Sequence, residues 1–164
     1  RLKPLGFDLR SWSRTSKDMT GVEGFAGAEQ FDAFLAGTDI LVNLLPLTPE
    51  TTGILNTQTF AKLRRDRLAG GPVIVNAARG GHQRESDIVA ALRDGTLGAA
   101  SLDVFETEPL PASSPLWDIE NCYITPHIAA ISNEATGVRY FTNIIKRHEA
   151  GEALVNVVDR RRGY

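Results

Sequence analysis

The sequence has little of what marks secreted, membrane-spanning or nucleic-acid-binding proteins. Its single cysteine, Cys122, cannot form an internal disulfide, which favours a reducing cytoplasm. No signal peptide opens the chain, and no apolar run is long enough to span a bilayer. A formal net charge of −2 leaves no basic surface for nucleic acid or an anionic membrane. The 164 residues, 42% of them hydrophobic, are enough for one globular domain with its own core.

Short apolar segments alternate with helical patterns along the chain. Strands are expected over residues 7–12, 39–45, 72–77, 98–104 and 121–125, and helices over residues 28–36, 56–65, 86–94 and 130–151. Residues 13–27 are polar and glycine-rich and are expected to form a loop. The alternation predicts an α/β domain with a doubly wound parallel sheet, whose inner strands 39–45 and 72–77 are buried. Ligands of such a sheet bind beyond the carboxyl ends of its strands.

The first residues have the pattern of a helix end. Arg1–Gly6 predicts the last turn of a helix that Gly6 terminates, and the sequence has no initiator methionine. We therefore expect the chain to be part of a longer protein whose N-terminal portion is missing here.

Three polar side chains follow three of the expected strands. The planar guanidinium of Arg79 can bind a carboxylate through two parallel hydrogen bonds. His127 can donate a proton to a carbonyl oxygen, and Glu108 can orient its imidazole and favour the protonated form. This set suits the reduction of a 2-keto acid. The structural alternatives are an ion pair at the sheet edge for Arg79, a packed or solvated histidine for His127, and a solvated loop acid for Glu108.

A hydroxyl and two cations follow the first expected strand, at Ser13, Arg14 and Lys17. In a dinucleotide-binding fold, an acidic residue at this point binds the adenosine 2′-hydroxyl of NAD. Cations suit the 2′-phosphate of NADP instead, so NADP is expected, with NAD possible. The alternative is a solvated basic loop. No His, Cys, Asp and Glu cluster has the spacing of metal ligands, so no metal site is predicted.

The motifs resemble those of the D-isomer-specific 2-hydroxyacid dehydrogenases over nearly the whole chain. The arginine motif matches at Asn76–Gly80, and the glutamate motif matches at Leu102–Pro111. The histidine motif matches in two parts, Ser114–Trp117 and Thr125–Ala129, and the cofactor-side loop matches at Leu44–Gly53. The glutamate motif pairs its acid with a proline, as Glu108 is paired with Pro109, and this selects Glu108 over Glu106. The histidine motif likewise matches at His127.

The resemblance implies a domain organisation. Residues 1–130 would be a Rossmann-like NAD(P)-binding domain that lacks its first strand and its Gly-rich phosphate loop. Residues 131–164 would be a C-terminal helix and tail that pack toward a missing substrate domain. The full-length protein would be a homodimer.

The resemblance also implies cofactor contacts. Leu45, Pro46 and Thr51 are expected to line the ribose and nicotinamide side, with ordinary loop packing as their alternative, and Ala77 is expected to bind the cofactor. Asp103 would contact the nicotinamide amide, with a helix N-cap as its alternative. Trp117 would wall the substrate pocket or anchor the core. His82 and His148 are expected to be exposed.

The activity implied is NADPH-dependent reduction of a small 2-keto acid. Softer motifs at Trp12–Thr15, Arg79–His82 and Val158–Tyr164 point to substrates of the glyoxylate or hydroxypyruvate type. Two alternatives stay open: a dinucleotide-sensing binding protein that keeps the same side chains, and another dehydrogenase of the family, such as one that acts on phosphoglycerate. Turnover of NADPH with glyoxylate distinguishes an enzyme from a sensor.

Overall fold

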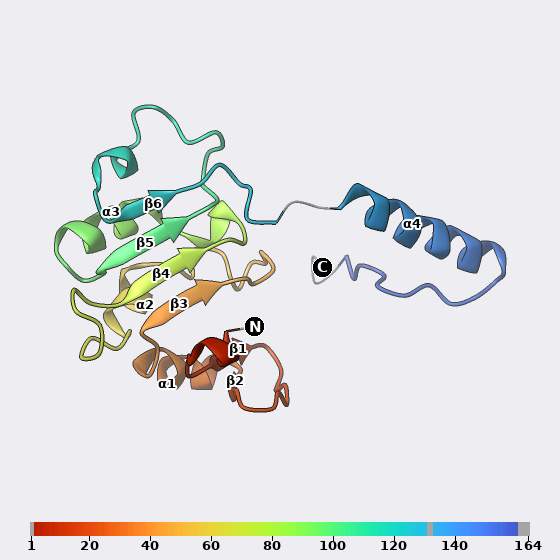
Figure 1. Cartoon of the computed structure of the whole chain (residues 1–164), viewed down its shortest axis with the longest axis horizontal. Coiled ribbons are helices and arrows are strands. Elements are labelled where there is room, and N and C mark those ends of the chain that lie inside the picture. The colour runs from red at the N-terminus through yellow and green to blue at the C-terminus, as the bar shows by residue number, and fades with distance from the viewer. Residues whose placement is uncertain (1, 131–132, 161–164) are drawn as a thin grey trace.

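Parallel strands form the main sheet of the protein. The computed structural model describes residues 2–130 and 133–160, and this part contains a four-stranded sheet in the order β3-β4-β5-β6 (Figure 1). The strands are β3 (Ile40–Asn43), β4 (Val73–Asn76), β5 (Ala99–Leu102) and β6 (Cys122–Ile124), and each pairs in parallel with the next. The predicted α/β fold with a parallel sheet is confirmed. All four carboxyl ends therefore meet at one edge.

The helices between the strands pack on one face of this sheet. They are α2 (Thr57–Ala61), which begins at its N-cap Asn56, and α3 (Glu85–Arg93). The inward side chains of the strands join Phe60 and Ile88 of these helices in one buried cluster. Removal of this apolar surface from water is the main stabilising contribution to such a core.

The other face of the sheet is open in the described part of the chain. Side chains alternate between the two faces along a strand, and Ile40, Val42 and Tyr123 are 40%, 45% and 65% exposed. The prediction that the strand over residues 39–45 is buried therefore holds for Leu41 and Asn43 and is wrong for the outer face. In Figure 1 the helices lie behind the sheet and leave its near face uncovered.

A second, smaller sheet lies beyond β3 (Figure 1). It pairs β1 (Arg10–Ser13) with β2 (Glu23–Ala26) in parallel. The prediction of a loop over residues 13–27 is wrong for β2, because a strand of glutamate, glycine, phenylalanine and alanine carries no strand pattern of its own. β2 forms instead because it pairs with β1 and because Phe25 packs against Phe34, with ring centroids 5.9 Å apart.

The remaining helices agree with the predicted segments to within a few residues. The 3-10 turn η1 (Lys3–Leu5) ends at Gly6, where φ is 85° and the Gly6 N–H donates to the carbonyl of Lys3. Glycine adopts this left-handed conformation at little cost, which makes it a frequent helix terminator. The helix predicted over residues 28–36 is η2 (Ala28–Gln30) followed by α1 (Phe31–Ala36). Two short 3-10 turns also occur, η3 (Gly80–His82) and η4 (Pro115–Asp118).

Helix α4 (Glu134–Glu149) follows the main body and buries none of its residues. It begins at Asn133, whose side chain accepts a hydrogen bond from the N–H of Thr136. Val138, Phe141 and Ile145 recur at helical spacing and are all exposed. The predicted packing of this helix toward another domain stays a prediction. The basic end of the chain beyond residue 160 lies outside the described residues.

Replacement of a side chain on the covered face should destabilise the fold far more than the same change on the open face. Ile74 is fully buried, so Ile74→Ala should lower the free energy of unfolding by about 2–5 kcal/mol. The matched change Val42→Ala, on the open face, should cost only about 0.5 kcal/mol. Urea unfolding of the 164-residue chain measures both, and equal losses would show that the outer face is also covered in solution.

Candidate active site

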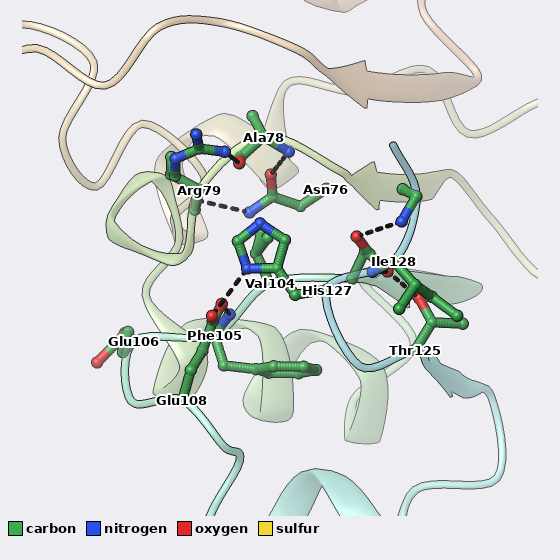
Figure 2. Close-up of polar contacts among 12 residues, drawn as sticks. Asn76, Ala78, Arg79, Val104, Phe105, Glu106, Glu108, Thr125, His127 and Ile128 are labelled. Atoms are coloured by element: carbon green, nitrogen blue, oxygen red, sulfur yellow. Dashed lines mark hydrogen bonds and ion pairs between the residues drawn. The ribbon is translucent and has the colours of Figure 1, made fainter. Parts of the chain in front are cut away.

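The three predicted catalytic side chains lie beyond neighbouring strands of the main sheet. Arg79 follows β4, Glu108 is in the loop after β5, and His127 is in the loop after β6. The strands are parallel, so all three loops are at the same edge, and Figure 2 shows the side chains in one view. Nδ1 of His127 is 2.8 Å from Oε2 of Glu108. The structure thus brings the predicted acid and imidazole into direct contact.

Glu108 is held in its charged form. Its pKa is lowered first by the hydrogen bond from His127, then by one from the backbone N–H of Phe105, 3.0 Å away, and further by the positive charges of His127 and Arg79. A carboxylate on Nδ1 fixes the proton there, which leaves Nε2 as the ring atom for proton transfer. The charge of Arg79 makes the smallest of these contributions to the lowered pKa of Glu108.

The neighbouring acid, Glu106, has a different partner. Its carboxylate accepts a hydrogen bond from the backbone N–H of Glu85 at 2.8 Å, and the Glu85 carboxylate accepts one from the N–H of Glu106 at 2.7 Å. This reciprocal pair ties the glutamate loop to the start of α3. The geometry therefore favours Glu108 as the partner of His127.

Asp103 holds the histidine loop. Its side chain, on a residue that is only 5% exposed at the end of β5, accepts hydrogen bonds from the hydroxyl of Thr125 and from the N–H groups of Ile128 and Ala129, both at 2.9 Å. Burial alone would raise the pKa of Asp103, but these hydrogen bonds outweigh it and lower the pKa. Between the anchored residues, His127 has φ 54°, a conformation that costs free energy and persists only where neighbours enforce it. The Asp103 carboxylate therefore accepts hydrogen bonds from the N–H groups of a loop, and it is not the N-cap of a helix.

The arginine loop and the glutamate loop are in backbone contact. A Cβ atom at Gly80 would lie 1.8 Å from the carbonyl oxygen of Phe105, so only glycine fits. Arg79 donates from Nη1 to the carbonyl of Ala78 at 2.6 Å. Within the described residues Arg79 forms no ion pair, so its alternative role in an ion pair at the sheet edge is not seen.

Two hollows flank these side chains. The first is lined by the segments Leu44–Leu47 and Ala77–Arg79. Leu45, Pro46 and Ala77 therefore lie together there, and their binding of a cofactor stays a prediction. The second is mostly apolar, and its walls include Glu108, His127 and Trp117. Trp117 is half exposed, with its indole N–H bonded to the carbonyl of Pro111 at 2.9 Å. Trp117 is therefore a pocket wall and not a core anchor.

Thr51 is buried and supports the first hollow from behind. Its hydroxyl donates to the carbonyl of Pro46 and accepts from the N–H of Thr48, both at 2.8 Å. It is absent from the lining of that hollow. The structure therefore places Thr51 in the loop that carries the wall.

The basic loop lies at the end of β1, in the smaller sheet. Ser13 donates to the carbonyl of Thr15 at 2.8 Å, and Arg14 and Lys17 are exposed. The pKa of Glu50 is lowered, chiefly by the Thr48 hydroxyl and in part by the charge of Arg14. The loop after β1 thus lies within electrostatic reach of the loop after β3, although the two strands belong to separate sheets.

His82 was expected to be exposed, and that prediction is wrong. It is 0% exposed, with Nδ1 3.0 Å from the carbonyl oxygen of Arg79 and Nε2 3.2 Å from that of Pro46. His148 is exposed on α4, as predicted. Burial raises the pKa of the Cys122 thiol to about 11, which keeps it protonated and unreactive.

Neither a metal cluster nor a membrane span is found where the structure describes the chain. Over residues 2–130 and 133–160, no group of three or more His, Cys, Asp and Glu side chains could hold a metal ion. None of the helices in these ranges is long and apolar enough to cross a bilayer.

Comparisons with known proteins identify relatives over the whole chain. Residues 1–129 match the family model of the D-isomer specific 2-hydroxyacid dehydrogenase, NAD binding domain. Glyoxylate/hydroxypyruvate reductase A of Escherichia fergusonii is 48% identical over 163 residues, which are 99% of this chain and 51% of that protein. The chain therefore spans about half the length of this curated relative.

Solved structures agree closely with the fold. A probable 2-hydroxyacid dehydrogenase from Rhizobium etli CFN 42, in complex with NADP, HEPES and L(+)-tartaric acid, has a TM-score of 0.93 at 57% identity. An NADPH-dependent glyoxylate/hydroxypyruvate reductase from Sinorhizobium meliloti, in complex with NADP and sulfate, has a TM-score of 0.96 at 49% identity. Each match covers 99% of this chain and 51% of the other.

Loss of the Asp103 charge should destabilise the protein and change its response to acid. Asp103→Asn removes acceptor capacity from a carboxylate with three hydrogen bonds, which should lower the free energy of unfolding by about 1.5–3 kcal/mol. The lowered pKa of Asp103 in the folded state means that its stabilisation is present above about pH 4 and is lost as the pH falls through the folded value.

Urea unfolding at pH 7 and at pH 3 tests this. The stability difference between wild type and Asp103→Asn should shrink at the lower pH, whereas the exposed control Glu120→Gln should follow wild type at pH 7. A difference that is the same at both pH values would contradict a role for the charged carboxylate.

Proposed function

The chain belongs to the D-isomer specific 2-hydroxyacid dehydrogenases, and we propose that the protein that contains it reduces a small 2-keto acid to the 2-hydroxy acid with NADPH. The observation that carries the proposal is the 2.8 Å contact between His127 and Glu108 at the carboxyl edge of the sheet. The named relatives support glyoxylate and hydroxypyruvate as the substrate type. The named relatives are about twice the length of this chain, so the activity is proposed for the whole protein and not for these 164 residues alone.

The side chains divide the reaction between them. Arg79 binds the substrate carboxylate and polarises the neighbouring carbonyl, because its guanidinium can form two parallel hydrogen bonds. His127 donates a proton from Nε2 to the carbonyl oxygen, and Glu108 holds Nδ1 and balances the positive charge of the protonated ring. Bound NADPH would supply the hydride to the keto carbon. In the oxidation direction, His127 accepts the proton.

The first hollow fits the nicotinamide and ribose. Its walls are apolar or small at Leu45, Pro46 and Ala77. Arg79 borders it, so a substrate carboxylate bound by Arg79 would lie next to the cofactor. Arg14 and Lys17, with the hydroxyl of Ser13, would bind the 2′-phosphate. The NADP complexes of two related proteins support NADP as the dinucleotide. Thr51 would act on the cofactor through the loop that it supports. Asp103 would contact the nicotinamide amide as well as hold the histidine loop.

The open surfaces support the proposed domain organisation. Residues 1–130 would form a partial dinucleotide-binding domain, and residues 131–164 would pack toward a separate substrate domain. The exposed side chains of Val138, Phe141 and Ile145 on α4 would be covered by that packing. A homodimer in the cytoplasm, with no nucleic-acid or membrane partner, completes the proposal.

Replacement of His127 should abolish most turnover and leave cofactor binding intact. In the full-length protein, His127→Asn should lower kcat with glyoxylate or hydroxypyruvate by about 10²–10⁴-fold, the usual contribution of a general acid. NADPH oxidation followed at 340 nm measures kcat, and quenching of protein fluorescence measures NADPH affinity. Glu120→Gln, an exposed position just before β6 at the end of the strands away from the site, is the control and should retain wild-type kcat. Wild-type protein that binds NADPH without turnover would indicate a dinucleotide sensor.

Reversal of charge in the basic loop should change the preference between the two dinucleotides. Arg14→Glu with Lys17→Glu should raise the KM for NADPH by about tenfold or more, equivalent to ~1.4 kcal/mol, and leave the KM for NADH nearly unchanged. The reason is repulsion between the new carboxylates and the 2′-phosphate. Steady-state kinetics with both cofactors test this, and an equal rise in both KM values would contradict a phosphate-binding role. The exposed pair Lys146→Glu and Arg160→Glu serves as the charge-matched control.

A further inference from the structure

His82 joins two loops that meet at the first hollow. It lies 36 residues after Pro46 and three after Arg79, and its two ring nitrogens are 3.2 Å and 3.0 Å from the carbonyl oxygens of these residues. The His82 side chain is fully buried, although Pro46 and Arg79 themselves are exposed residues. Pro46 and Arg79 both line the hollow, whereas His82 lies behind it.

The imidazole suits this position because it is rigid. Its two nitrogens are fixed in one planar ring, so hydrogen bonding at both ends sets the separation of the two carbonyl oxygens. A protonated ring donates to both carbonyl oxygens, whereas a neutral ring donates to only one of them. His82 already belongs to the Arg79 loop, so its link to the other loop is the hydrogen bond that a proton on Nε2 makes with the carbonyl of Pro46. Removal of the ring removes that link. The two loops also meet at Gly81, where an added Cβ would lie 3.0 Å from the side chain of Leu47.

Buried amides hold the arginine loop from the sheet side. Asn76 donates from Nδ2 to the carbonyl of Arg79 at 3.2 Å and to Oε1 of Gln83 at 2.8 Å, and it accepts from Asn43 at 3.0 Å. Gln83 donates to the carbonyl of Val104 at 3.0 Å. These contacts link the ends of β3, β4 and β5. The contact of His82 with the Pro46 carbonyl continues this set of polar contacts from the strand ends to the cofactor-side loop.

We propose that His82 is a positioning residue that sets the spacing between the Pro46 loop and the Arg79 loop, and so fixes Arg79 relative to the bound nicotinamide. This role rests on the proposed function, because Arg79 must meet the keto acid beside the cofactor. His82 touches neither substrate nor cofactor and acts through the two carbonyl groups.

The test compares two His82 variants with a core control in the full-length protein. His82→Leu keeps an apolar side chain in the buried space and removes both contacts, whereas His82→Gln keeps an amide N–H that can reach one carbonyl. The control is Leu97→Ala, since Leu97 is also 0% exposed but lies just before β5, at the opposite end of the strands from the site. Melting temperature, NADPH affinity, KM and kcat are measured for each.

His82→Leu should lower kcat/KM for the keto acid by about 10- to 100-fold, mostly through KM, and should weaken NADPH binding. His82→Gln should have a kcat/KM and an NADPH affinity between those of His82→Leu and wild type. If His82→Leu does not fold, His82→Gln is compared with wild type and Leu97→Ala instead. Leu97→Ala should lower the melting temperature and leave KM and NADPH affinity close to wild type. The inference is overturned if the His82 variants keep wild-type KM and NADPH affinity, or if Leu97→Ala changes them as much.

Failure of the proposed function is separately visible. Wild-type protein without turnover of glyoxylate or hydroxypyruvate would reject the proposed reaction. The affinity for NADPH alone would then decide the role of His82: weaker binding by His82→Leu than by Leu97→Ala supports the bridge, and equal binding overturns it.

Discussion

The carboxylate of Asp103 is the constraint on which the arrangement of the site depends. It is almost fully buried at the end of β5, yet it stays ionised because the Thr125 hydroxyl and two backbone N–H groups of the histidine loop bond to it. Those donors flank His127, whose left-handed backbone would otherwise relax. The position of the imidazole against Glu108 therefore depends on a third residue, Asp103, whose hydrogen bonds go to the histidine loop and not to Glu108. Both acids are held charged by donors from the histidine loop, and Glu108 also by the N–H of Phe105 in its own loop.

The same edge of the sheet is rigid for a second reason. Buried amides at the ends of β3 and β4 bond to each other and to Gln83, and Gly80 lets the arginine and glutamate loops touch through their backbones. These buried amide and backbone contacts fix the backbone of the loops, and the charged side chains on those loops are thereby held close to one another. The apolar core beneath it positions the strands, and the polar contacts above it position the loops.

Sequence patterns predicted the parts of this structure that depend on local order. The strand ends could be read from the apolar runs, and the loops that follow three of these strands hold Arg79, Glu108 and His127. Contacts that join distant residues could not. His82 has no local signal of burial, since its partner Pro46 is 36 residues away. The strand β2 escaped notice because its stability comes from β1 and from Phe25 packing.

The hydrogen bonds between Asp103 and the histidine loop could not be predicted from the sequence either, because their donors lie 22 to 26 residues after Asp103. The apolar sequence of β3 predicted burial on both faces, which was right for only one of them in the described part of the chain.

That open face has a consequence for handling the chain in solution. β3 is hydrogen-bonded on one side, to β4, and presents Ile40 and Val42 next to a row of backbone donors and acceptors. An exposed strand edge beside an apolar patch is a template for pairing with other molecules. At high concentration the 164-residue chain by itself would be prone to aggregate through this edge, and a charged substitution such as Val42→Lys would improve its solubility without disturbing the core on the far side.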